Sequence, residues 1–493
     1  MSPKALIVAS LTESPDEDRL ATLTGQVDIL EVRGDLVRDV EVGWLRSHFH
    51  GELLFTLRSR EEGGRSDASP DRRRQRLLAA ADHYDLVDLE LQRDLSSELL
   101  STVPARRRIV SWHGPPSSMA TLQEFFGRMA ETEARYYKLV PFAEQPRQEI
   151  APLALLQALQ RQDVIAFASG SIGSWTRLLA PRFGAPVVFA AAHTSPAAPG
   201  QLSVETLVED YGLPDLPAAE DLFGLVGGAI EHSLSPRLHN GIYRQLGLPF
   251  LYLPFTVEAF GEFWLEVVES GAFEELGLRL RGLSVTAPHK TIASAVAGAS
   301  SPLVEWLGSA NTLMCREGVW EAESTDGEGI LRPLHRRGIP IADRLAAVVG
   351  AGGAGRAAVV ALLEAGARVT LVNRSVDHGR KAATELRVPY RSLEGFDPGE
   401  YGIIVHATPL GRQSDDPLLI DPGRLSRDTV VVDMVYLRSA PTRLVSEVRA
   451  MGGEAVDGRE VLLYQAVPQF YLMTGQQLPV DVGSQLVGME LVD

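Results

Sequence analysis

The N-terminal part of the chain alternates short apolar runs with amphipathic stretches of helical length. Over residues 1–205, each apolar run is followed by a stretch such as Pro70–Ala81 or Met119–Thr132. Because parallel strands need a helical crossover, this alternation predicts an α/β fold, here a closed (β/α)8 barrel. The stretch is short for that fold, so its helices or loops must be trimmed. The predicted strands are Ala5–Ala9, Ile29–Arg33, Leu53–Arg58, Leu86–Leu91, Arg108–His113, Tyr136–Val140, Val164–Ser169 and Val187–Ala191.

A segment rich in proline and acidic residues separates this pattern from a second α/β pattern. We expect the barrel to occupy residues 1–208 and a linker to occupy 209–220. An α/β substrate-binding domain is expected over 221–330, with a C-terminal helix over about 466–493 returning to it. A Rossmann-type dinucleotide-binding domain is expected over 331–465.

A glycine-rich loop follows the apolar run Leu345–Val349 and precedes a helix-like stretch and a second apolar run, Arg368–Val372. In this context the glycines permit a tight turn and let the backbone approach a pyrophosphate at the helix N-terminus. The loop therefore predicts a nicotinamide-dependent dehydrogenase. Its residues are Gly350, Ala351, Gly352, Gly353, Ala354 and Gly355.

The residues after the second run indicate which cofactor is bound. An NAD-binding unit usually carries an acidic residue here, which holds the ribose 2′-hydroxyl. This chain has Asn373, Arg374 and Ser375 instead. Since an arginine suits a 2′-phosphate, the sequence predicts NADP. We also expect Thr408 and Gly458 to contact this cofactor.

Polar residues upstream of the loop suggest a substrate site. Ser233 and Ser235 precede a helix and can both reach one small anion, although a plain helix cap explains them equally well. Lys290 follows Pro-His at the end of an apolar strand, and Asn311 and Asp326 supply an amide and a carboxylate. A Lys–Asp pair in a cleft can relay a proton to and from a hydroxyl during hydride transfer.

Lysine is scarce in this chain, which makes each lysine worth weighing. Only four of the 47 basic residues are lysines: Lys4, Lys138, Lys290 and Lys381. An amine can lose its proton near neutral pH, whereas a guanidinium cannot. A lysine here is therefore a candidate nucleophile or base. The alternative is that it remains by chance in a sequence that otherwise favours arginine.

Lys138 ends one predicted barrel strand, and an amine near other cations can attack a ketone and form a Schiff base. His113 ends the preceding strand, so we expect it to move a proton, with Glu90 orienting it or balancing its charge. A buried structural histidine is the alternative for His113 alone.

Charge and cysteine content narrow the function further. The net charge of −17 argues against a general affinity for nucleic acid. The single cysteine, Cys315, excludes an intrachain disulfide and a cysteine-based zinc site, and it suits a reducing cytoplasm. We expect no metal, no signal peptide and no membrane span. The expected partners are small molecules, and the oligomeric state is not indicated.

Residues 221–493 resemble the shikimate dehydrogenase family. The resemblance rests on HSLSPRLHN (232–240), GLSVTAPHK (282–290), SANTL (309–313), STDGEG (324–329), GAGGAGRA (350–357), NRS (373–375), ATPLG (407–411), VVDMVY (431–436) and QAVPQF (465–470). It implies that Lys290 and Asp326 form the catalytic pair. Ser284, His406 and Arg412 depart from the family's usual residues. The cyclic hydroxy acid would be bound by Ser233, Ser235, Thr286, Asn311, Asp326, Tyr436 and Gln465.

Residues 5–205 look like type I 3-dehydroquinate dehydratase. The resemblance rests on ILEVRGD (29–35), FTLRSREEGG (55–64), VDLEL (87–91), SWHG (111–114), YYKLVP (136–141), GSWTR (173–177) and APGQ (198–201). It implies a Schiff base on Lys138 and proton transfer by His113. Gly114 and Ala197 replace an aspartate and a serine that are usual in the family. The substrate would be held by Glu31, Arg33, Arg58, Arg177 and Gln201.

Together the two resemblances predict a bifunctional shikimate-pathway enzyme. Its first site would dehydrate 3-dehydroquinate to 3-dehydroshikimate, and its second would reduce that product to shikimate with NADPH. Two alternatives stay open at this point. The dehydrogenase could oxidise quinate or shikimate with NAD, or the barrel could be a non-catalytic module.

Overall fold

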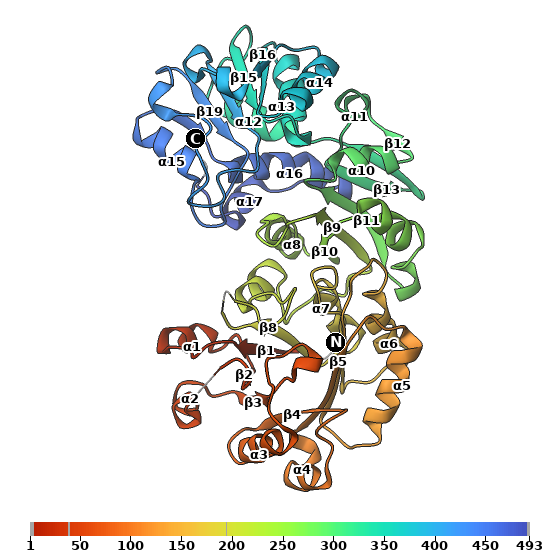
Figure 1. Ribbon diagram of the computed structural model, residues 1–493. Coiled ribbons are helices and arrows are strands. Elements are labelled where there is room, and N and C mark those ends of the chain that lie inside the picture. Colours follow the sequence, from red (N-terminus) through yellow and green to blue (C-terminus); the bar gives the residue numbers. More distant parts are fainter. Residues whose placement is uncertain (1–3, 38–39, 194, 491–493) are drawn as a thin grey trace. The chain divides into compact units, whose positions relative to one another are not determined.

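The computed structural model describes residues 4–37, 40–193 and 195–490 (Figure 1). It divides into two compact units. The first unit comprises Met1–Asp221 and Pro249–Arg279, and the second comprises Leu222–Leu248 and Leu280–Asp493.

The first unit is built on an eight-stranded sheet in the order β7-β6-β5-β4-β3-β2-β1-β8. The strand pairs along this order are parallel, as in β1 with β2 and β5 with β6. The predicted eight-stranded α/β fold is thus confirmed. The strands are β1 (Leu6–Leu11), β2 (Ile29–Arg33), β3 (Glu52–Thr56), β4 (Leu86–Glu90), β5 (Arg108–Gly114), β6 (Tyr136–Pro141), β7 (Val164–Ala166) and β8 (Val187–Ala191).

Side chains from all eight strands meet in one apolar cluster inside this sheet. Val8 of β1, Leu54 of β3, Ile109 of β5, Ile165 of β7 and Phe189 of β8 are among its members. The interior is therefore packed as in a closed barrel, although β7 and β8 stand at the two ends of the hydrogen-bonded order. The carboxyl ends of parallel strands in such a barrel face one rim, where the loops can carry a site.

The crossover helices of the first unit are short, as the length of the region requires. The two predicted helix-length stretches form α3 and α5, each begun by a serine side chain that accepts a backbone N–H, from Arg72 and from Thr121. The same unit contains β10 (Phe250–Thr256) and α9 (Phe260–Phe263). The helices between the barrel strands are α1 (Glu17–Leu23), α2 (Val42–His48), α3 (Pro70–Ala81), α4 (Ser97–Thr102), α5 (Met119–Ala130), α6 (Ile150–Leu159) and α7 (Thr176–Leu179).

The second unit begins with a mixed sheet in which β9, β11, β13, β14 and β12 are neighbours in that order. The pairs β11–β13 and β13–β14 are antiparallel. These strands are β9 (Asp221–Gly227), β11 (Arg279–Val285), β12 (Ala299–Ser300), β13 (Thr312–Arg316) and β14 (Val319–Glu323). The helices of this part are α8 (Ser235–Leu246), α10 (Lys290–Val296), α11 (Pro302–Leu307) and α12 (Asp326–Arg336).

A parallel sheet in the order β17-β16-β15-β18-β19-β20 completes the second unit. This is the doubly wound order of a Rossmann fold, which binds dinucleotides where the order reverses, between β15 and β18. Separate apolar clusters pack on its two faces. The strands are β15 (Leu345–Val349), β16 (Arg368–Asn373), β17 (Tyr390–Ser392), β18 (Ile403–His406), β19 (Val430–Asp433) and β20 (Glu454–Val456).

The helices of this sheet are α13 (Gly353–Glu364), α14 (Val376–Leu386) and α15 (Arg443–Ala450), and the chain ends with α16 (Gly458–Thr474) and α17 (Val480–Leu486). Helix α16 packs on α12, and α17 packs on α8. The predicted domain boundaries remain predictions, since the compact units divide the chain differently. No helix within the described ranges is long and apolar enough to cross a membrane.

Two candidate active sites

The first candidate site is a cavity of about 440 Å³ at the rim where the barrel strands end. It brings together residues that lie far apart in the sequence, because they lie on or follow several parallel strands, with Glu31 and Arg33 both on β2. Of the residues predicted for this site, all but Glu90 line the cavity: Glu31, Arg33, Arg58, His113, Lys138, Arg177 and Gln201.

Lys138 lies in β6 with its side chain inside the barrel, where it is 5% exposed. Its Nζ sits 3.8 Å from the centre of the Phe189 ring. Burial lowers the pKa of Lys138 from 10.5 to about 8, and the positive charges of Arg58 and Arg33 act in the same direction against Glu31 and Asp88. A larger share of the amine is therefore unprotonated near neutral pH than in an ordinary lysine.

His113 ends the neighbouring strand β5, and its partner is Glu62. The Nδ1 atom of His113 lies 3.2 Å from Oε2 of Glu62, and the His113 backbone N–H donates to the same oxygen over 3.0 Å. Burial, together with the charges of Arg58 and Lys138, lowers the pKa of His113 well below 6.5. The ring is thus neutral near pH 7, and a hydrogen bond from Nδ1 to Glu62 leaves Nε2 as the basic nitrogen.

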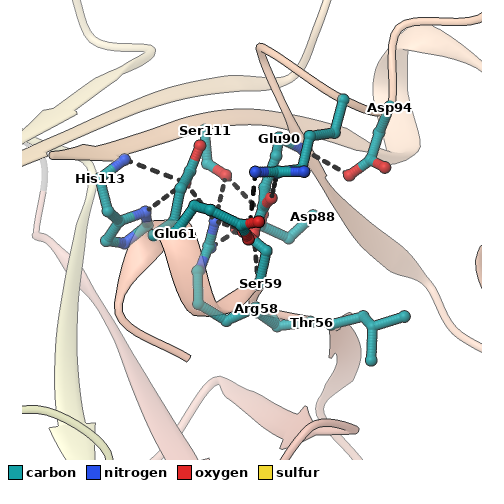
Figure 2. A network of polar contacts seen from close by, with 12 residues as sticks. Thr56, Arg58, Ser59, Glu61, Asp88, Glu90, Asp94, Ser111 and His113 are labelled. Carbon is teal, nitrogen blue, oxygen red and sulfur yellow. Dashed lines mark hydrogen bonds and ion pairs between the residues drawn. The ribbon is translucent and has the colours of Figure 1, made fainter. Parts of the chain in front are cut away.

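Glu90 does not contact His113 in the structure; it belongs to a polar network around Arg58 (Figure 2). Its Oε1 accepts from Arg58 and from the backbone N–H of Ser59, and its Oε2 lies 3.3 Å from Arg73. Arg58 also donates to Asp88 over 2.9 Å and to Glu62 over 3.0 Å. Arg58 therefore has two roles: it lines the cavity, and its hydrogen bonds hold the carboxyl groups of Glu62, Asp88 and Glu90 in place.

Of the three arginines that line the cavity, Arg177 is the one without a carboxylate partner among the described residues. It follows Trp175 in the chain, is 4% exposed, and its guanidinium lies 4.4 Å over the Phe167 ring. Its Nε has no hydrogen-bond partner. Burial lowers the pKa of Arg177 to about 10, and Glu31 offsets only part of this. A buried, unpaired guanidinium that lines a cavity is suited to receive an anion such as a carboxylate.

Glu31, Gln201 and Arg33 are positioned by hydrogen bonds to neighbouring side chains and backbone groups. Glu31 accepts from the hydroxyls of Ser10 and Thr56, the latter over 2.7 Å. Gln201 donates to Ser10 over 3.1 Å and accepts from the backbone N–H of Ala197. Arg33 binds Asp35 through two hydrogen bonds and donates to the carbonyl oxygen of Ala197 over 3.3 Å.

The second candidate site centres on an ion pair between the first residues of two helices. Lys290 begins α10 and Asp326 begins α12, and Nζ lies 2.5 Å from Oδ2. Asn311 donates to the other Asp326 oxygen over 2.9 Å, which fixes the carboxylate. The Asp326 side chain is 3% exposed and that of Lys290 is 14% exposed, so the amine is the more accessible member of the pair.

Ser233 and Tyr436 also meet in the second unit, although 203 positions separate them. Their hydroxyl oxygens lie 3.4 Å apart, and the backbone N–H of Ser235 donates to Oγ of Ser233 over 3.1 Å. Thr286 follows β11 and donates its backbone N–H to Val226, at the end of β9. Gln465 lies on α16 against Gly329 of α12, the helix that Asp326 begins.

The glycine loop connects β15 to the N-terminus of α13, as the sequence predicts. A Cβ atom on Gly355 would lie 2.0 Å from the carbonyl oxygen of Gly350, so only glycine allows this close approach. A Cβ on Gly352 would have nothing within 4 Å, which leaves open space where a pyrophosphate would approach. A Cβ on Gly353 would meet the Lys290 side chain at 3.0 Å, so the ion pair lies beside the loop.

The predicted 2′-phosphate contact is exposed and available. Arg374 follows β16 and forms no hydrogen bond or ion pair with another described residue, whereas Asn373 is held by the carbonyl oxygen of Ser375. Thr408 follows β18 beside Gly350, and its hydroxyl oxygen lies 2.7 Å from Nε2 of His406. For Gly458 the structure gives a packing reason: a Cβ there would lie 2.2 Å from the carbonyl oxygen of Val435.

Comparison with known proteins assigns two consecutive regions of the chain to families. The sequence profile of type I 3-dehydroquinase matches residues 5–215, and that of the shikimate dehydrogenase substrate binding domain matches 225–313. A shikimate dehydrogenase (NADP(+)) of Methanopyrus kandleri is 34% identical, over 55% of this chain and 96% of the relative. The chain belongs to the shikimate dehydrogenase family.

Relatives that span both regions join this dehydrogenase to the barrel. The chloroplastic bifunctional 3-dehydroquinate dehydratase/shikimate dehydrogenase of Arabidopsis thaliana is 25% identical, over 93% of this chain and 80% of the relative. The structure of the dehydroquinate dehydratase and shikimate dehydrogenase of S. pombe AroM covers 98% of each chain at 25% identity, with a TM-score of 0.44. This shikimate dehydrogenase therefore carries a type I 3-dehydroquinase region in front of it.

Sequence reasoning missed three residues of the dehydroquinase region and one of the shikimate dehydrogenase region. Glu62 lies in a turn rather than at a strand end, so a search of strand ends passes over it. Ser10 and Thr56 donate to Glu31, and Ser10 also accepts from Gln201; these contacts join residues that are distant in the sequence. His406 was noted as a departure, but its contacts with Asp433 and Thr408 come from the fold.

Proposed function

We propose that this bifunctional enzyme dehydrates 3-dehydroquinate to 3-dehydroshikimate at Lys138 and reduces 3-dehydroshikimate to shikimate beside Lys290 and Asp326. The observation that carries the first step is a buried amine, with its pKa lowered to about 8, on the same cavity as a neutral histidine. The relatives that span both regions support the pairing of the two activities. A cytoplasmic location is part of this proposal and rests on the single cysteine.

In the first step, the Lys138 amine adds to the substrate ketone and water leaves, which forms an imine. The imine withdraws electrons from the adjacent carbon, so its proton becomes easier to remove. His113 takes that proton at Nε2 and returns it to the departing hydroxyl, which leaves as water. Hydrolysis of the imine then frees the product and the amine. Arg177 holds the substrate carboxylate, which supplies the anion that this buried guanidinium lacks.

The second step needs a hydride at the substrate carbonyl carbon, which NADPH would supply when bound. The residues present fit this cofactor: the open approach at Gly352, the close contact at Gly355 and the unpaired Arg374 suit its pyrophosphate and 2′-phosphate. Lys290, oriented by Asp326, gives a proton to the developing alkoxide. Ser233, Ser235 and Tyr436 bind the ring substituents of the substrate.

A coupled assay tests both steps together. Purified protein receives 3-dehydroquinate and NADPH, and NADPH oxidation is followed by absorbance. We expect oxidation to start from 3-dehydroquinate without any added dehydratase. Consumption that begins only when 3-dehydroshikimate is supplied would show that the barrel is not catalytic.

The imine is tested separately by trapping. Sodium borohydride added with 3-dehydroquinate should leave a covalent mass adduct on the peptide that contains Lys138, and Lys138→Arg should abolish it. Dehydration without an adduct on that peptide would refute the Lys138 mechanism while leaving the reductase untouched.

A further inference from the structure

His406 is a buried histidine in the dinucleotide-binding part of the second unit, and the reduction proposed above gives it no role. It is the last residue of β18, and it pairs with Asp433, the last residue of the neighbouring strand β19. The side chain of His406 is 6% exposed and that of Asp433 is 1% exposed. Strand β18 borders the point where the strand order reverses, at which a doubly wound sheet binds its ligand.

Asp433 holds the imidazole of His406 in one orientation. Nδ1 of His406 lies 2.9 Å from Oδ1 of Asp433. The carboxylate is itself fixed, because it accepts from the Thr442 hydroxyl over 2.6 Å and from the Val435 backbone N–H over 3.0 Å. Since a carboxylate can only accept, Nδ1 carries the proton of the neutral imidazole, and Nε2 is left as an acceptor.

Thr408 meets that acceptor. Its hydroxyl oxygen lies 2.7 Å from Nε2 of His406, and the backbone N–H of Leu410 donates to the same oxygen over 3.3 Å. Because Nε2 has no proton of its own, the hydroxyl gives its single proton to the histidine. Toward a ligand, the Thr408 oxygen can therefore only accept a hydrogen bond.

The location of Thr408 limits which part of a dinucleotide it can meet. Thr408 is half-buried, and a Cβ on Gly350 would lie 3.2 Å from its methyl group, so it borders the glycine loop. The two halves of a doubly wound sheet each bind one mononucleotide. Arg374 follows β16 in the first half, which takes the adenosine side, whereas β18 begins the second half. Thr408 therefore faces the nicotinamide side.

The groups on that side differ in whether they can donate a hydrogen bond. Pyrophosphate oxygens cannot donate to Thr408, whereas the N–H bonds of the nicotinamide carboxamide can. The ribose hydroxyls can donate as well, but a hydroxyl pairs with a donor or an acceptor alike. Only the amide N–H requires a partner that is fixed as an acceptor.

We propose that His406, held by Asp433, positions the Thr408 hydroxyl as the hydrogen-bond acceptor for the carboxamide N–H of the nicotinamide ring. The hydrogen bond restricts rotation of the ring about its bond to the ribose. This inference rests on the proposed binding of NADP(H) at the glycine loop and adds a specific contact to it. His406 acts through Thr408 and does not touch the cofactor.

Two dinucleotides that differ in one group test the contact on the full-length protein. NADP⁺ carries the carboxamide, and its 3-acetylpyridine analogue has a methyl group in place of the NH₂. Calorimetric titrations give both dissociation constants at about pH 8.5, where an ordinary imidazole is neutral. We expect NADP⁺ to bind about tenfold more tightly than the analogue, which is the size of one hydrogen bond. Equal binding would overturn this inference alone, whereas binding of neither would also refute the proposed cofactor site.

Variants identify the acceptor and the residue that positions it. Thr408→Val removes the hydroxyl and should abolish the preference for NADP⁺, whereas Thr408→Ser keeps the hydroxyl and should preserve it. His406→Asn places an amide beside Asp433 but has no atom in the place of Nε2, so the preference should fall below about threefold. His406→Gln reaches the place of Nε2 and should retain most of the preference.

Thr442→Val is the matched control. It removes a buried hydroxyl from the same carboxylate without changing the contact of Thr408, so it should lower thermal stability but leave the preference intact. A preference that survives in Thr408→Val or His406→Asn, or that is equally lost in Thr442→Val, would contradict the inference. If His406→Asn does not fold, as its thermal melt would reveal, the valine and serine variants of Thr408 still decide whether that hydroxyl is the acceptor.

Discussion

At the scale of single residues, burial sets the chemistry of the dehydroquinase cavity. Lys138 and His113 are both shifted toward the form that the proposed reaction needs, a free amine and a neutral imidazole, because desolvation disfavours their charged forms. The neighbouring arginines act in the same direction. Glu31 and Asp88 act in the opposite direction on Lys138.

The lowered pKa of Lys138 makes a prediction about pH. Because this pKa falls from 10.5 to about 8, the amine becomes free as the pH rises through about 8. We expect kcat/KM for dehydration to rise about tenfold per pH unit below that value and to level off above it. Initial rates of 3-dehydroshikimate formation measure this. A profile that is already flat at about pH 7 would contradict the assignment.

Glu62 and Glu90 make a second prediction, since the structure gives them different partners. Glu62→Gln should lower kcat for dehydration by about 10–100-fold with little change in KM, because it removes the carboxyl group that orients His113. Glu90→Gln is the matched control, and it should mainly lower thermal stability, because it weakens the buried pairs with Arg58 and Arg73. Equal losses of kcat at unchanged stability would mean that Glu62 has no special role.

At the scale of elements, the turn from β15 into α13 shows two different uses of glycine. Gly350 adopts a positive φ of 117°, and Gly355 contacts the Gly350 carbonyl too closely for any side chain. These two positions shape the turn itself. Gly352 has open space beside it, so its lack of a side chain matters only to a ligand.

This contrast makes a third prediction. Gly355→Ala should destabilise the second unit by about 1–3 kcal/mol, as overpacking does. Gly352→Ala should change stability by less than about 0.5 kcal/mol but weaken NADPH binding by about tenfold or more, because its methyl group would occupy the approach of the pyrophosphate. Thermal melts and NADPH fluorescence titrations separate the two effects. Unchanged NADPH affinity in Gly352→Ala would place the pyrophosphate elsewhere.

At the scale of the whole molecule, each compact unit contains its own complete set of predicted reacting residues. Lys138 and His113 belong to the first unit, and Lys290, Asp326 and the glycine loop belong to the second. The chemistry of either step therefore needs no residue from the other unit.

Crossed variants test this independence, which is the fourth prediction. Lys138→Arg should abolish dehydration but leave the reduction of supplied 3-dehydroshikimate within about twofold of wild type, since it keeps the positive charge and acts on one cavity only. Lys290→Ala should lower reduction by about 10²-fold or more without loss of NADPH affinity, and should leave dehydration unchanged. Separate assays of the two steps on each variant measure this. Loss of both activities in either variant would show that the sites are interdependent.

Much of the fold followed from the sequence because its signals are local. The run Leu345–Val349 and the barrel runs at 29–33 and 187–191 were predicted at the bounds that the structure gives. The glycine spacing placed the dinucleotide loop, since strand, turn and helix each require particular residues in a fixed order. Strand ends were placed within a few residues, and the placement of His113 and Lys138 on neighbouring strands followed from them, although Lys138 lies within β6 rather than at its end.

Contacts between distant positions were decided only by the tertiary structure. The sequence determined that His113 and Lys138 belong to adjacent strands, but not that Glu62, rather than Glu90, faces the imidazole. It likewise gave no sign that Glu149 would be fully buried. The physical reason is that residue type and period specify which elements form and which faces are apolar, whereas burial and pairing depend on how those elements pack. The pKa values on which the proposed chemistry rests are therefore properties of the fold.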